Sequence, residues 1–255
     1  MSATTKSPYC ILAMICVLAG LYAVLLLNNE TTLYLTKEDG VIEDLGAGCF
    51  FLSSIFFLLA YYRSYGSRGL FGLGRMKIKR NLFYLFFGVV LLFGSLEELS
   101  WGQRIFRFQT PEFFLKYNRQ KEVNIHNLRW FHGRDESEKE KGFVGKLTNV
   151  DRLFSVFWFG FCLCIPLAYG KFPGVRTLLD KIRLPIVPVA FGILFLCTYV
   201  ASKLIALDPY INGRAIVEVK ESNFAFLFLC VAINEFHSGH KRWKPDEPAD
   251  EGQTS

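Results

Sequence analysis

Six long apolar segments constrain this chain more strongly than any other feature of its sequence. About 20 predominantly apolar residues in a helix cross a bilayer, and each segment approaches that length. The segments lack the period-two alternation of a membrane β-barrel, the other architecture that satisfies backbone polar groups in lipid. The sequence therefore predicts an all-α integral membrane protein, a polytopic bundle of about six transmembrane helices. We expect these helices near residues 9–27, 46–62, 82–103, 153–170, 184–205 and 215–236.

The composition agrees with this class and indicates which partners to expect. The chain is 51% hydrophobic, and all seven cysteines lie inside apolar segments, where we interpret them as small packing residues. No disulfide framework or thiolate metal site is predicted. The chain has a net charge of +6 but no nucleic-acid motif, so we expect its cations to lie in loops and to interact with lipid headgroups. The lipid bilayer, and no nucleic acid, is the expected partner.

Charge in the loops predicts the orientation. The 63–80 loop carries six Lys/Arg and no acid, whereas residues 28–45 carry five acids and one cation. The positive-inside rule then places both termini of a multi-pass protein in the cytoplasm, in the cell (inner) membrane. The polar loop 104–150 falls on the outer side, and its ten Lys/Arg argue against this orientation.

We expect one membrane domain, residues 1–240, followed by a polar cytoplasmic tail, residues 241–255. The first apolar run is interpreted as a retained helix, because it is longer than the apolar part of a usual signal peptide and lacks a cleavage pattern.

Two pairs of carboxylates are predicted at similar depth near the outer membrane interface. The third apolar run has only fifteen uncharged residues before Glu97, so its helix must include Glu97 and Glu98 to span. The last helix must likewise include Glu218 and Glu221, which are three residues apart and share a face. Acids within the membrane are costly unless they are paired or wetted, and they mark functional sites.

On the third helix, spacings of three, four and seven residues place four side chains on one face, with Glu98 about 100° away. Those four are Glu97, Ser100, Trp101 and Arg104.

The long loop contains a second polar pattern. Polar side chains alternate along this loop, and an extended chain would place them all on one side. Such a row could line a site for a polar ligand, and it could also bring His126 to the carboxylates. These side chains are Asn118, Gln120, Glu122, Asn124 and His126. Trp101 and Trp130 also fit an aromatic belt at the membrane interface.

The strings EELSWGQRIF (97–106), Thr110-Pro111-Glu112 and NRQKEVNIHN (118–127) resemble an uncharacterised family of bacterial integral-membrane proteins with the pattern EExSWGQRIF, TPE and NxQxExNxHN. The resemblance covers about 30 residues and implies where a site lies. It implies no reaction, because that family has no established function. Gln103 and Asn127 join the candidate set through it.

Three functions fit these residues. The first is a metal-dependent hydrolase or transferase acting on a lipid, glycolipid or lipid-linked substrate, with a divalent metal ion as cofactor. The second is a non-catalytic partner or sensor that binds an envelope component or another envelope protein, and the third is an ion-coupled transporter. The catalytic candidates are Glu97, Glu98, Ser100 and His126. The substrate-binding candidates are Trp101, Gln103, Arg104, Asn118, Gln120, Glu122, Asn124 and Asn127. The metal-binding candidates are Glu97, Glu98, His126, Glu218 and Glu221.

Overall fold

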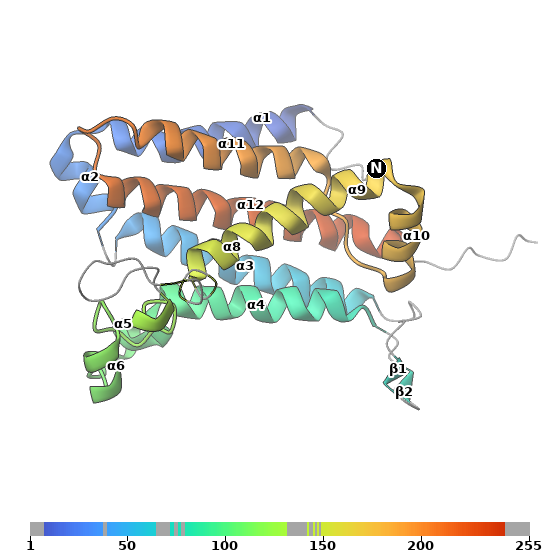
Figure 1. The fold of residues 1–255 in the computed structure, drawn as a ribbon, viewed down its shortest axis with the longest axis horizontal. Helices are drawn as coiled ribbons and strands as arrows, with labels where there is room; N and C mark the ends of the chain where they lie inside the picture. The colour runs from blue at the N-terminus through green and yellow to red at the C-terminus, as the bar shows by residue number, and fades with distance from the viewer. Residues whose placement is uncertain are drawn as a thin grey trace, which may run out of the picture.

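The computed structural model describes residues 8–37, 40–64, 72–73, 76–77, 80–131, 142, 145, 147 and 149–242. In these ranges the chain is helical apart from loops and one short antiparallel hairpin (Figure 1). The first half contains α1 (Pro8–Ala23), η2 (Val24–Leu26), α2 (Asn29–Leu35), α3 (Val41–Arg63), β1 (Gly72–Leu73), β2 (Met76–Lys77), α4 (Leu82–Glu98), η3 (Ser100–Gly102), α5 (Gln103–Phe106) and α6 (Glu112–Tyr117). The second half contains η4 (Arg129–Phe131), α8 (Val150–Trp158), η5 (Phe159–Cys164), α9 (Ile165–Lys171), α10 (Pro173–Ile182), α11 (Val189–Ile205) and α12 (Gly213–Arg242).

The long helices lie side by side in one bundle, with α12 at its centre (Figure 1). Most of the middle of α12 is buried: Leu227 and Val231 are fully enclosed by apolar and aromatic side chains, while Phe226 and Cys230 are half-buried. Phe195 and Trp158 stack with their ring centroids 5.9 Å apart, and both rings contact Phe224 of α12. The bundle core is therefore aromatic, as the 26 phenylalanines of the sequence suggest.

The helical run from α8 to α9 changes its winding where the sequence requires it. Pro166 has no N–H to bond the carbonyl of Cys162, and its ring would crowd that carbonyl in a regular α-helix. The preceding segment, η5, is π-helical, which is a common way to absorb such a break. The wide turn packs against α11 at Gly192, where any side chain would collide with the Cys162 carbonyl.

Most of the predicted helices correspond to observed ones. The apolar runs 9–27, 46–62 and 153–170 form α1 with η2, α3, and the α8–α9 run. The run 184–205 becomes helical only from Val189, because Pro185 and Pro188 disfavour a helical backbone in the residues before them, and residues 184–188 are not helical. At the C-terminus, α12 continues to Arg242, and the rest of the predicted tail lies outside the described residues.

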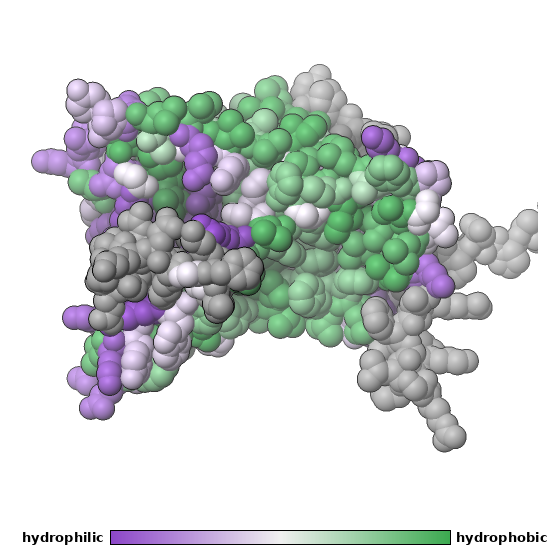
Figure 2. Space-filling view, viewed as in Figure 1, coloured by the Kyte–Doolittle hydropathy of each residue, from purple (hydrophilic) through white to green (hydrophobic). Residues whose placement is uncertain are grey.

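Within the described ranges, two helical stretches are long and apolar enough to cross a membrane, Val41–Arg63 and Arg152–Lys171. The apolar helices Cys10–Leu26 and Val189–Ile205 are shorter. Figure 2 shows hydrophobic side chains over the middle of the visible face and hydrophilic side chains gathered at the end that holds α2, α5 and α6. Helix α1 begins and α12 ends at the opposite end of the bundle (Figure 1).

Candidate functional site

The chain turns sharply at the polar end of the bundle, immediately after Glu98. After Leu99, the residues Ser100, Trp101 and Gly102 have φ angles of 45°, 54° and 78°, all in the left-handed region. The prediction of a helix running from 82 to 103 is therefore wrong beyond Glu98, and Glu97 and Ser100 do not share a helical face with Trp101 and Arg104. A left-handed conformation costs of order 1–3 kcal/mol in a non-glycine residue, so contacts elsewhere must hold this turn.

The carboxylate of Glu97 makes those contacts. One oxygen accepts a 2.5 Å hydrogen bond from the indole Nε1 of Trp101, which closes the turn. The other oxygen accepts from the backbone N–H groups of Ile125 and His126, at 2.6 and 2.7 Å. Glu97 is only 4% exposed, so it fastens the polar loop to the end of α4 from a buried position.

His126 lies between this carboxylate and an amide. Its Nδ1 atom is 3.2 Å from the bonded oxygen of Glu97, and its Nε2 atom is 3.0 Å from the side-chain nitrogen of Asn127. A neutral ring with its proton on Nδ1 satisfies both contacts, since Nε2 then accepts from Asn127. Burial opposes protonation of His126. The hydrogen bond to Glu97 and the charges of Glu98, Glu97 and Glu221 outweigh burial and raise the pKa of His126 above its ordinary value.

The polar loop 118–128 is folded on itself rather than extended. Asn118 pairs with Leu128 in an isolated bridge, its side chain donates to Asn124, and Lys121 has a φ of 60°. The extended conformation predicted from the period of two is therefore wrong, because side-chain to backbone bonds fold the segment locally. Exposure still alternates in most of the loop: Arg119, Lys121 and Ile125 are exposed, while the five alternate polar residues are buried or half-buried.

Buried hydrogen bonds tie the loop to the turn after α4. Ser100 is fully buried and donates a 2.5 Å hydrogen bond to a carboxylate oxygen of Glu122. The side-chain oxygen of Gln103 accepts from the backbone N–H of Val123 at 2.9 Å. Asn127 donates to the side-chain oxygen of Gln120. The loop is thus a bonded unit fixed to the end of α4.

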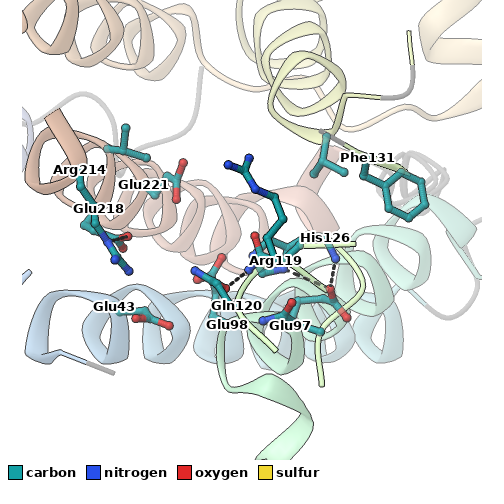
Figure 3. A pocket seen from close by; sticks show the side chains of 14 residues that line it. Glu43, Glu97, Glu98, Arg119, Gln120, His126, Phe131, Arg214, Glu218 and Glu221 are labelled. Carbon is teal, nitrogen blue, oxygen red and sulfur yellow. Dashed lines mark hydrogen bonds and ion pairs between the residues drawn. The ribbon is translucent and has the colours of Figure 1, made fainter. Parts of the chain in front are cut away.

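A pocket of about 500 Å³ lies beside this unit, between the loop and the ends of three helices (Figure 3). Its acids come from different elements: Glu43 from α3, Glu97 and Glu98 from α4, and Glu218 and Glu221 from α12. The other lining residues are Arg119, Gln120, Asn124, His126, Asn127, Phe131, Val150, Arg214 and Val217.

Two buried serine hydroxyls fix the three acid-bearing helices relative to one another. Ser222, next to Glu221, donates to the carbonyl of Ile42 at 2.6 Å, which joins α12 to the start of α3. Ser95, one turn before Glu98, donates to the carbonyl of Ala47 at 3.0 Å and joins α4 to α3. A side chain at Gly46 would press against the Ser222 hydroxyl at 3.1 Å, so glycine permits this close approach.

Cations compensate part of the negative charge. Arg214 lies 3.9 Å from Glu218, one turn along α12, and Lys220 lies 3.4 Å from Glu221. Figure 3 shows Arg119 reaching across the pocket between the acids of α12 and His126. In the part of the chain that the structure describes, no three His, Cys, Asp or Glu side chains stand in a ready-made metal-binding arrangement.

The structure separates the predicted site residues into two groups. Lining the pocket are Glu97, Glu98, Gln120, Asn124, His126, Asn127, Glu218 and Glu221. Ser100, Trp101, Gln103, Asn118 and Glu122 instead hold the turn and the loop. Arg104 belongs to α5, and its side chain lies outside the described part of the structure.

Three charged lining residues were missed from the sequence. Glu43 was assigned to the acidic 28–45 loop, because α3 begins five residues before its apolar run. Arg214 lies in the polar first turn of α12. Arg119 lies between the alternating polar residues of the loop and is not among the predicted candidates. A search for acids and cations one turn outside each apolar run would have found Glu43 and Arg214.

Comparison with known proteins adds nothing to this geometry: no family model, no curated protein and no solved structure matches the chain.

Proposed function

We propose that this protein is a six-span membrane protein that acts as a metal-dependent hydrolase or transferase on a lipid or lipid-linked substrate. Its site would lie at the outer membrane interface, with both termini in the cytoplasm. The observation that carries the proposal is that five glutamates from three helices and a histidine line one pocket at the polar end of an apolar bundle. Large apolar side chains exposed along the helices, such as Leu52 and Val156, are suited to contact lipid.

The charge in the pocket favours binding of a cation. The lining carries five carboxylates against two arginines and one histidine. The charges of Glu43 and Glu221 act on both Glu98 and Glu218, which is a costly arrangement in a buried site. A divalent cation would offset this repulsion and hold the carboxylates together.

The hydrogen bonds suggest which residues would bind that cation. Both oxygens of Glu97 are engaged by four donors from Trp101, Ile125 and His126. The carboxylates facing the pocket from other directions are Glu98, Glu218 and Glu221, with Glu43 nearby. An oxygen ligand set of this kind suits Mg²⁺ or Mn²⁺.

The remaining lining residues suit an amphipathic substrate. Arg119 could bind a phosphate or carboxylate of a headgroup, and the amides of Gln120 and Asn124 could bind its hydroxyls. Phe131, Val150 and Val217 give the same pocket an apolar side. A bound divalent cation would activate a water molecule or polarise the scissile ester, and hydrolysis would consume that water and break one ester or phosphoester bond.

Lipid turnover tests this proposal. The purified protein is reconstituted in nanodiscs with phospholipids, glycolipids and lipid-linked phosphates, with and without Mn²⁺, and the products are measured by mass spectrometry. We expect one lipid class to be consumed by the wild type with Mn²⁺ and not by Glu98→Gln or Glu221→Gln. Glu30→Gln, an exposed acid of α2, is the matched control and should behave as wild type. Unchanged lipids in every class would overturn the enzymatic proposal.

A second candidate, a non-catalytic sensor that binds an envelope component, is favoured by one observation. The catalytic candidate Ser100 is fully buried and bonded to Glu122, so it serves the structure of the loop. Ligand binding without turnover would support this candidate.

A further inference from the structure

A segment beside the pocket exposes an unusual amount of apolar surface. We call it the lateral arm: residues 103–117 together with 129–131. Figure 1 shows α5 and α6 projecting to the side of α4, away from the bundle, at the end that holds the pocket. Phe106 is 76% exposed and Ile105 is 66% exposed. The other exposed large apolar side chains of the arm are Phe108, Phe113, Leu115 and Trp130.

The aromatic rings of the arm form an ordered group. The rings of Tyr117 and Trp130 stack with centroids 5.5 Å apart, and Phe113 contacts both, at 5.2 and 6.0 Å. The ammonium of Lys116 lies 5.1 Å from the centre of the Tyr117 ring, and Arg107 is exposed between the two short helices. Exposed aromatic rings beside Lys and Arg are typical of segments that lie at the membrane–water interface.

The arm continues the apolar outer surface of α4. Phe86, Val89 and Phe93 are exposed along that helix. The ring of Phe93 then meets Trp101 edge to face, with centroids 5.6 Å apart, at the turn where the arm begins. Within the arm, Gln103 donates to Thr110 at 2.6 Å, and its side-chain oxygen accepts from Val123 of the polar loop at 2.9 Å, which ties the arm to that loop. One apolar surface therefore runs along α4 and turns outward into the arm.

We propose that the lateral arm is an interfacial lipid-binding element, whose aromatic rings insert among lipid headgroups while Arg107 and Lys116 bind the phosphates of anionic phospholipids. Cations near an anionic surface strengthen such binding. This inference rests on the membrane-spanning part of the proposed function and does not depend on the proposed reaction. Because the arm and the polar loop are both fixed at the turn after α4, the arm would hold the pocket at headgroup level.

Tryptophan quenching tests the insertion. The protein is reconstituted in phosphatidylcholine vesicles that carry bromine either high or deep on the acyl chains, and fluorescence is compared between wild type and Trp130→Phe. We expect the shallow bromines to quench more than the deep ones, and Trp130→Phe to lose that difference. The lipid-binding arm would be overturned if the protein resists alkaline extraction but Trp130→Phe keeps the same shallow quenching. It would also be overturned if only aqueous acrylamide quenches Trp130, or if cross-linking shows that a protein partner covers Trp130. Release by alkaline extraction would instead overturn the membrane-spanning premise.

Headgroup preference is tested separately. Adding phosphatidylglycerol to the vesicles should shift the Trp130 emission to shorter wavelength in the wild type, and Arg107→Gln/Lys116→Gln should lose the shift. Lys181→Gln, an exposed cation of α10 at the other end of the bundle, is the matched control and should keep it. The same shift in all three proteins would contradict a role for the two cations.

Discussion

The Nδ1 atom of His126 lies 3.2 Å from a carboxylate oxygen of Glu97, although 29 residues separate them in the chain. The same oxygen accepts the backbone N–H of His126 and of Ile125, so one buried carboxylate holds both the loop and its imidazole. Glu97 therefore positions the pocket's histidine, and the acids of α3 and α12 complete the wall opposite.

Substitution of Glu97 tests this positioning role. In Glu97→Gln the side-chain NH₂ must face an N–H donor, and a charged acceptor is lost. Hydrogen bonds to a charged group contribute roughly 1.5–3 kcal/mol, so we expect the free energy of unfolding to fall by about that amount. Thermal unfolding in detergent measures this loss of stability. Protease cleavage within residues 118–128 should also increase, because the loop is held less firmly. Glu30→Gln should leave both unchanged, and an unaltered melting temperature in Glu97→Gln would contradict the role.

The pH dependence of stability tests the charge on His126. Its pKa is raised in the folded protein, so protonation of the ring stabilises the fold. This stabilisation of the fold is fully present below about pH 6.5, the pKa of a histidine in the unfolded chain, and it is lost as the pH rises through the higher pKa of the folded protein. We expect the melting-temperature difference between wild type and His126→Gln to be largest at acidic pH and to shrink as the pH increases. A difference that stays constant with pH would show that protonation of His126 does not contribute. The charged groups that face the ring include Glu97, Glu98 and Glu221.

The turn after α4 depends on glycine at one position. Gly102 has a φ of 78°, and an added Cβ would lie 3.0 Å from the Phe106 ring. We expect Gly102→Ala to destabilise the protein by about 1 kcal/mol or more and to weaken the bond between Trp101 and Glu97. Gly48→Ala is the matched comparison, because that residue is helical and a Cβ there meets nothing within 4 Å. Equal melting temperatures for the two variants would show that the turn tolerates side chains.

Most of the helices, and the meeting of the acids from two of them, were predictable from the sequence, because both follow from the lengths of apolar runs. Glu98 and Glu221 had to be helical and near one level for their helices to be long enough, and they line the same pocket. The turn at Ser100 was not predictable, because a left-handed Trp101 has no local sequence signal and is stabilised by a carboxylate bonded to a distant loop.

The loop illustrates both outcomes. Alternation of polar residues correctly indicated that the Asn124 side of the loop turns inward. It could not distinguish an extended strand from a folded loop, because Asn118 and Asn124 bond to each other only after the chain has turned. The role of Ser100 is likewise a tertiary property, since its partner Glu122 lies 22 residues away.

Cation binding tests the central claim most directly. Purified protein is titrated with Mn²⁺ by calorimetry, and its metal content is measured by elemental analysis, for the wild type, Glu98→Gln/Glu218→Gln/Glu221→Gln and the control Glu30→Gln. We predict saturable binding to the wild type and the control, with an affinity lower by more than about tenfold in the triple variant. Absence of Mn²⁺ binding to the wild type, or equal binding by the triple variant, would contradict a cation site among these carboxylates.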